Sequence, residues 1–174
     1  MLDDDWTPPL RTRMATLCPG YIFNYVQLQD DLFARLQDYS IEKKVMVLRS
    51  ICNGWATSYR YHETVRLPCL FGCKLLHPVD QRKRGQRDDM VHYLGCPFLW
   101  KLVETLTGEY FCFISDRLGV GRHDGVEGII LAHHLYHFLK MGRKQEATQV
   151  TSWRQLALVH DSVLRFGRAI LLEG

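Results

Sequence analysis

Residues 69–96, CLFGCKLLHPVDQRKRGQRDDMVHYLGC, contain two pairs of residues with the spacing of metal ligands. Cys69 and Cys73 are four positions apart, and so are His92 and Cys96. Both spacings are typical of the halves of a structural zinc site. A spacing of four also places His92 and Cys96 on one face of a helical turn. The sequence therefore predicts a closed Cys3His zinc site.

The residues around these pairs favour the same interpretation. Gly72 suits a tight turn between the first two cysteines, and Asp88 or Asp89 can cap a helical turn that carries the second pair. Four protein ligands leave no open position for water, so such a site is structural rather than catalytic. Two alternatives stay open. His77, inside the loop, can replace a ligand, or the cysteines are ordinary buried or surface thiols.

The loop between the two pairs is basic. Its stretch QRKRGQR at 81–87 contains Arg82, Lys83, Arg84 and Arg87. Such a cluster is suited to contact phosphates, and holding it on a zinc-closed loop would lower the entropic cost of binding. A solvated surface loop is the alternative. Further cations and aromatic residues can extend this surface or, for the aromatics, form core: Arg60, Arg66, Lys140, Arg143, Lys144, Tyr59, Tyr61, Phe71 and Tyr93.

The totals describe an ordinary globular chain. Its 174 residues are 47% hydrophobic and 24% charged, with a net charge of +3. No run of apolar residues is long enough for a membrane span. Six cysteines without a secretory segment favour metal binding over disulfides.

Helical periodicity dominates outside the cysteine region, so we predict a mostly α-helical fold with an embedded Cys3His module and at most a short β element. Irregular structure is expected before residue 24, and a short strand at 109–114. Helices are expected over about 24–39, 41–58, 97–106, 125–141 (opened by an Asp124 cap) and 152–172. The predicted divisions are an arm (1–23), a helical pair (24–60), the zinc module (61–100) and a C-terminal helical region (101–174), within one compact domain.

Three stretches resemble the zinc-binding tail that follows the reverse transcriptase domain in non-LTR retrotransposon polyproteins. They are NGWATSYRYHE at 53–63, LPCLFGC at 67–73 and DDMVHYLGCPFLW at 88–100. A His-rich helix downstream, LAHHLYHFLKMGR at 131–143, is also similar to the family. The aromatic-x-Asp-Asp motif of the polymerase is missing, since LQDD at 28–31 and RDD at 87–89 lack its aromatic residue. The resemblance therefore implies a nucleic-acid-binding accessory module without the polymerase.

Together these features predict a non-catalytic zinc protein that binds RNA, with ribosomal RNA and neighbouring proteins of a large assembly as partners. A retroelement-derived part of an organellar ribosome is the concrete form of this hypothesis. It implies a mitochondrial location, with the nucleus as the alternative. We expect neither a membrane nor a small-molecule substrate.

Three other functions remain open from the sequence. The protein can be a DNA-binding regulatory zinc protein, an interaction protein without nucleic acid, or a metal-stapled nuclease using His77 and Asp80. His133 and His137 have the spacing of a metal pair. We expect them instead to pack on their helix, because residue 134 is His where a zincin has Glu.

Overall fold

The computed structural model describes residues 7–17, 24–58, 60–62, 67–76, 87–121, 125–145, 150 and 152–173. Most of these residues are helical, and within these ranges no strand forms beyond one antiparallel bridge between Pro68 and Arg87. The mostly α-helical prediction is therefore confirmed. The elements are α1 (Thr7–Leu17), α2 (Tyr25–Leu36), α3 (Ile41–Ile51), the 3-10 turn η1 (Cys73–Leu75), α4 (Met90–Gly95), α5 (Pro97–Thr107), α6 (Ile114–Arg117), α7 (Gly125–Gln145) and α8 (Trp153–Glu173).

Side-chain caps explain where several helices begin. The side chains of Asn24 and Ser40 accept hydrogen bonds from the backbone N–H groups three residues on, at the starts of α2 and α3. Ser152 does the same for α8. Pro97 begins α5, where a missing backbone N–H costs nothing.

The chain forms two compact units. The first unit comprises Met1–Gly54 and Phe111–Ile130, and the second comprises Trp55–Tyr110 and Leu131–Gly174. In the first unit, Leu28, Leu32 and Leu36 form a buried stripe along α2. Arg35 donates hydrogen bonds to the carbonyl oxygens of Gly119 and Gly121 and so joins α2 to that segment.

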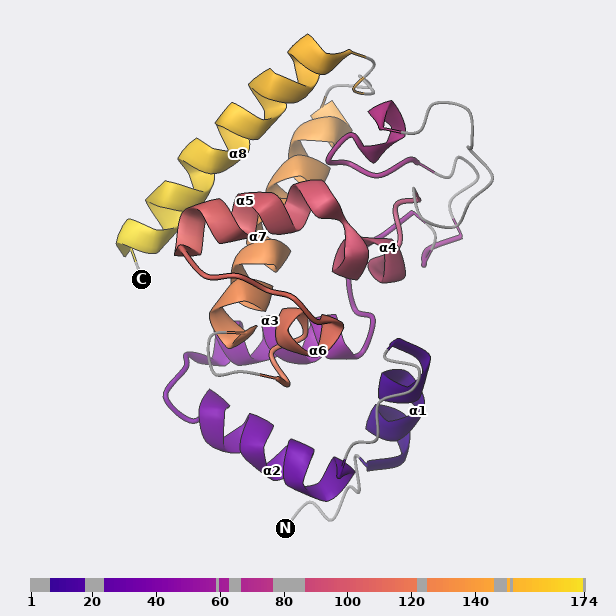
Figure 1. Ribbon diagram of the computed structural model, residues 1–174, viewed down its shortest axis with the longest axis vertical. Helices are drawn as coiled ribbons and strands as arrows, with labels where there is room; N and C mark the ends of the chain where they lie inside the picture. Colours follow the sequence, from indigo (N-terminus) through magenta and orange to yellow (C-terminus); the bar gives the residue numbers. More distant parts are fainter. Residues whose placement is uncertain are drawn as a thin grey trace. The chain divides into compact units, whose positions relative to one another are not determined.

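Aromatic packing forms the core of the second unit. Trp55 stacks on Tyr136 with 4.8 Å between ring centroids, and Tyr93 lies 5.0 Å from Tyr136. The indole N–H of Trp100 donates to the carbonyl oxygen of Tyr93. α5 and α8 lie side by side within this unit (Figure 1).

Three predictions of local structure are wrong. Residues 7–17 form α1 rather than irregular chain, because Pro8 and Pro9 stand in its first turn, where backbone N–H groups have no helical partner. α3 ends at Ile51 instead of Ser58, since Asn53 adopts a left-handed conformation (φ 59°) and closes a Schellman motif with Gly54.

The strand expected at 109–114 is also absent from the structure, and α6 begins at Ile114. Here the side chain of Arg117 binds the carbonyl oxygen of Phe111, and Asp116 accepts a hydrogen bond from the N–H of Phe113. Side chains therefore bind backbone groups that a sheet would have used.

Some apolar residues of α2 and α3 are exposed. They lie off the buried stripes of these helices, which include Leu28 and Leu32 of α2 and Val47 and Ile51 of α3. The exposed residues are Val26, Phe33, Ile41 and Val45. Among the described residues, no helix has the length and apolar character needed to cross a membrane.

Candidate metal centre

The four predicted ligands lie together in the second unit. Ligand atoms of Cys69, Cys73, His92 and Cys96 are all within 4.8 Å of one another, and all four side chains are buried. The Sγ atom of Cys96 is 3.7 Å from that of Cys69 and 3.4 Å from that of Cys73. All three cysteines are free thiols. The chain thus forms a Cys3His cluster that can hold a metal ion.

A tight turn positions the first pair. The N–H of Gly72 donates to the carbonyl oxygen of Cys69, and η1 begins at Cys73. Gly72 has φ 85°, a conformation that favours glycine. A β-carbon at this position would also meet Leu156 Cδ1 at 2.5 Å, so the turn packs closely on α8.

A short helix positions the second pair. The carboxylate of Asp89 caps α4 by accepting the N–H of His92 at 2.7 Å, as one of the two predicted caps. Cys96 ends α4 and begins α5, where its Sγ accepts the N–H of Leu99. The i, i+4 spacing then brings His92 and Cys96 to the same side of this turn.

The residues fit a bound metal ion in two respects. Nε2 of His92 is buried and has no hydrogen-bond partner among the described residues, which is costly unless something binds it. Burial raises the pKa of the Cys69 and Cys96 thiols, whereas hydrogen bonds from these two thiols lower the pKa of Cys73. A metal cation would stabilise the deprotonated form of all three thiols.

Next to the cluster lies a second buried polar group, which we call the Asp88 network. Oδ1 of Asp88 accepts hydrogen bonds from the hydroxyls of Tyr93 (2.7 Å) and Tyr136 (3.3 Å). Oδ2 accepts the backbone N–H of Ser58 (2.7 Å) and pairs with the ammonium of Lys140 (3.2 Å). The carboxylate is fully buried, so these four donors replace the water that it loses.

Tyr93 connects the network to the cluster. Its hydroxyl donates to Asp88 and accepts the N–H of Leu70, the residue after Cys69. Tyr93 itself follows His92 in the sequence. One side chain therefore links the two halves of the cluster to α7, which carries Tyr136 and Lys140.

The structure describes only part of the predicted nucleic-acid surface. Arg82, Lys83 and Arg84 lie outside the described residues, as does His77. Arg87 is described, is partly buried, and forms the bridge to Pro68. The structure therefore places Arg87, the last residue of the basic segment, next to Pro68 and thus close to Cys69. The rest of the segment lies outside the described residues.

Three proposed extensions of that surface are wrong. Lys140 is buried in the ion pair with Asp88, so it cannot extend a basic patch. Phe71 and Tyr93 are fully buried, which confirms the alternative that they are core. Tyr61 is exposed, as base stacking would require.

The histidines of α7 behave as packing residues. His133 is buried, with its ring 5.7 Å from Trp55 and 4.3 Å from His137. Among the described residues, only the Cys3His cluster brings three or more possible ligands together.

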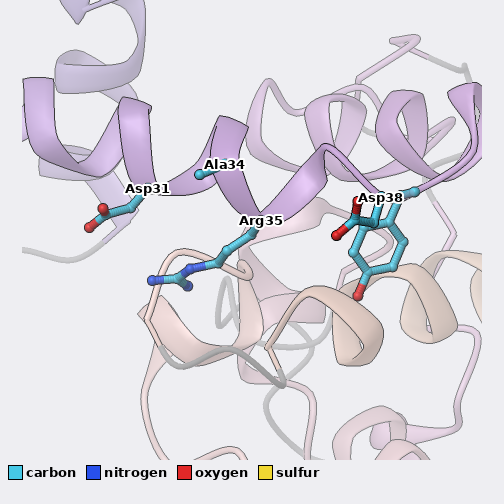
Figure 2. Close-up of a pocket in the computed structure, with 5 residues that line it drawn as sticks. Asp31, Ala34, Arg35 and Asp38 are labelled. Atoms are coloured by element: carbon cyan, nitrogen blue, oxygen red, sulfur yellow. The ribbon is translucent and has the colours of Figure 1, made fainter.

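The first unit has a surface pocket at the end of α2 (Figure 2), lined by Asp31, Ala34, Arg35, Asp38 and Tyr39. Arg35 already binds two backbone carbonyls, and both carboxylates are exposed. This arrangement is typical of a surface depression.

Local sequence patterns do not reveal the Asp88 network. They mark Asp88 only as a possible helix cap, and nothing in the local sequence pairs residue 88 with residue 140. A comparison with known proteins finds no match among protein-family models, curated proteins or solved structures.

Proposed function

We propose that the protein is a non-catalytic zinc protein that binds RNA as a structural part of a ribonucleoprotein assembly. The buried Cys3His cluster is the observation that carries this proposal. It brings Cys73 and His92 together, and these are the residues between which the basic segment lies.

Zinc is the metal that this donor set favours. Three thiolates and one imidazole are typical of structural zinc sites. Tetrahedral coordination with bonds of about 2.3 Å to sulfur requires sulfur atoms about 3.8 Å apart. The separations of 3.4 and 3.7 Å in the cluster lie close to this value without a metal. Four protein ligands would complete the coordination shell, so the site would not activate water.

The position of the basic segment between the two ligand pairs supports the proposal of RNA binding. The bridge between Pro68 and Arg87, and the hydrogen bond from the N–H of Asp88 to the carbonyl oxygen of Leu67, hold the chain just before the second pair against the first. Arg82, Lys83 and Arg84 are therefore part of a segment whose two ends are fixed. Fixed ends reduce the conformational entropy that phosphate binding has to overcome.

The larger setting is part of the same proposal. The long helices α7 and α8 would contact neighbouring proteins, and an organellar ribosome is the assembly that we favour. A retroelement origin would account for the cysteine and histidine pattern described above.

The proposal is tested with zinc-loaded protein and a fluorescently labelled RNA. One variant neutralises Arg82, Lys83 and Arg84 to Gln, and a matched control neutralises the exposed Arg11, Arg49 and Arg168, which changes the charge equally. Losing three phosphate contacts to single-stranded RNA should lower the slope of log affinity against log salt by about two.

The control variant should retain most of the affinity and the slope. Equal weakening by both variants would mean that only net charge matters, and the basic segment would lose its role. Absence of RNA binding by the zinc-loaded wild type would overturn the proposal. A duplex DNA of the same sequence tests the regulatory alternative, which tighter binding to the duplex would favour.

A further inference from the structure

A group of aromatic side chains lies at the start of α8, and one of them is largely exposed. The ring of Trp153, the first residue of α8, is 57% exposed and contacts Phe98 of α5 edge to face, with 6.5 Å between centroids. Phe98 has the same kind of contact with His160, at 5.2 Å. By contrast, Trp55 and Trp100 are almost completely buried.

This group lies beside the Cys3His cluster. A ring nitrogen of His160 is 3.3 Å from the carbonyl oxygen of Phe71, within the turn between Cys69 and Cys73. Gly72 of the same turn packs on Leu156 of α8. Phe98 follows Cys96 by two residues. In Figure 1 the start of α8 accordingly lies close to the segment that contains η1.

Three cations belong to the segments that carry the aromatic group. They are Lys74, Lys101 and Arg154, and the carboxylates that follow these segments in the sequence are Glu104 in α5 and Asp161 in α8. Lys101 and Arg154 are exposed, and Lys101 is three residues after Phe98, on the same side of α5. The nearest acidic residue along α8, Asp161, pairs with Arg165.

We propose that Trp153, supported by Phe98 and flanked by Lys101 and Arg154, stacks on an unpaired base of the bound RNA. This inference rests on the proposed RNA-binding function and adds a second contact to the basic segment. An exposed aromatic ring offers a face to any base, and neighbouring cations attract the phosphates on either side of that base. The exposed cations Lys101 and Arg154 favour RNA over an apolar protein partner, which would not use their charge.

The decisive variant is Trp153→Ala, measured by fluorescence anisotropy with zinc-loaded protein and a labelled single-stranded RNA of mixed sequence. Because the variant removes the ring on which the base would stack, we expect the affinity to fall roughly tenfold. The salt dependence should stay unchanged, since no phosphate contact is removed. Trp153→Phe retains a ring and should restore most of the affinity.

A matched control is Leu158→Ala, which removes an exposed apolar side chain from the same helix and should leave the affinity unchanged. The same RNA annealed to its complement should show little effect of Trp153→Ala, because its bases are already stacked. Circular dichroism and zinc content should be the same for all of these proteins.

The outcomes separate this inference from the proposed function. If the wild type binds RNA, neutralising Arg82, Lys83 and Arg84 weakens it, and Trp153→Ala does not, only the stacking inference is overturned. If Trp153→Phe is as weak as Trp153→Ala, or if duplex and single strand are affected equally, stacking is also overturned. If the wild type binds no RNA, both proposals fail.

Discussion

The second unit contains two buried polar groups with opposite character. In the Asp88 network, protein donors satisfy the buried carboxylate: two tyrosine hydroxyls, one backbone N–H and the ammonium of Lys140. In the Cys3His cluster, three sulfur atoms and an imidazole lie close together, and Nε2 of His92 has no hydrogen-bond partner within the described part of the chain. Protein groups alone neutralise and solvate the carboxylate of the network, whereas the cluster would need a cation to do the same for its thiolates.

We infer that the two groups have different roles in positioning the ligands. Tyr93 belongs to both, because its hydroxyl binds Asp88 and Leu70 while its neighbour His92 is a cluster residue. The network can therefore orient the two halves of the cluster, and the metal would then fix them. Variants that disable one group at a time test whether the two groups act separately on stability and on zinc binding.

The largest effect is expected from Cys96→Ser. This variant removes the sulfur atom that lies 3.7 Å from Sγ of Cys69 and 3.4 Å from Sγ of Cys73, so zinc content should fall from about one per chain to nearly none. Since a structural zinc ion contributes on the order of 10 kcal/mol to folding, the free energy of unfolding should fall by several kcal/mol. Elemental analysis and chemical denaturation measure the two quantities.

Cys112→Ser is the matched control, because Cys112 is an exposed free thiol outside the cluster. It should keep both the zinc and the stability of the wild type. Full zinc occupancy in Cys96→Ser would show that Cys96 is not a ligand. A chelator added to the wild type should reproduce the loss of stability seen in the variant.

The next effect is expected from Asp88→Ala. It removes the carboxylate that pairs with buried Lys140, and breaking a buried ion pair from one side costs about 3–5 kcal/mol. The double variant Asp88→Ala/Lys140→Met should recover part of this loss, because the buried charge is then gone. Denaturation curves give the free energies, and zinc content should remain about one per chain.

A surface ion pair provides the control for this experiment. Asp161 and Arg165 are 2.8 Å apart, and both side chains are mostly exposed. Asp161→Ala should therefore change stability by less than about 1 kcal/mol. If Asp88→Ala lost zinc as completely as Cys96→Ser, the two groups could not be treated as separate.

Most of the helices could be predicted because their determinants are local. Ser40, Asp89 and Pro97 are capping or first-turn residues that mark helix starts in the sequence itself. The errors at the end of α3 and at the start of α1 also have local causes, but these causes are harder to recognise in a sequence. Asn53 ends α3 through a left-handed conformation that few residues other than glycine adopt, and two prolines that look like breakers fit the first turn of α1.

Part of the site could likewise be predicted from local features, and part could not. The four cluster residues were predicted from their spacing, because the members of each pair are four positions apart. The partners of Asp88 could not be predicted, because Tyr136 and Lys140 are about fifty positions away and meet it only after α7 packs. Burial could not be predicted from local patterns either: Phe71 and Tyr93 were open to stacking or to core packing from the sequence, and the structure buries both.

The smallest effect is expected from Gly72→Ala, which tests how the turn between Cys69 and Cys73 rests on α8. A left-handed backbone costs a non-glycine residue about 1–2 kcal/mol, and crowding against the end of the Leu156 side chain, which can shift, adds about 1 kcal/mol. In a Leu156→Ala background, which carries its own cavity cost, Gly72→Ala should lose the crowding term and cost only the backbone term. Gly95→Ala is the control, because a β-carbon there meets no atom within 4 Å and should change stability little. If Gly72→Ala were as stable as Gly95→Ala, close packing on α8 would not hold the turn, and the metal and the Asp88 network would have to position it by themselves.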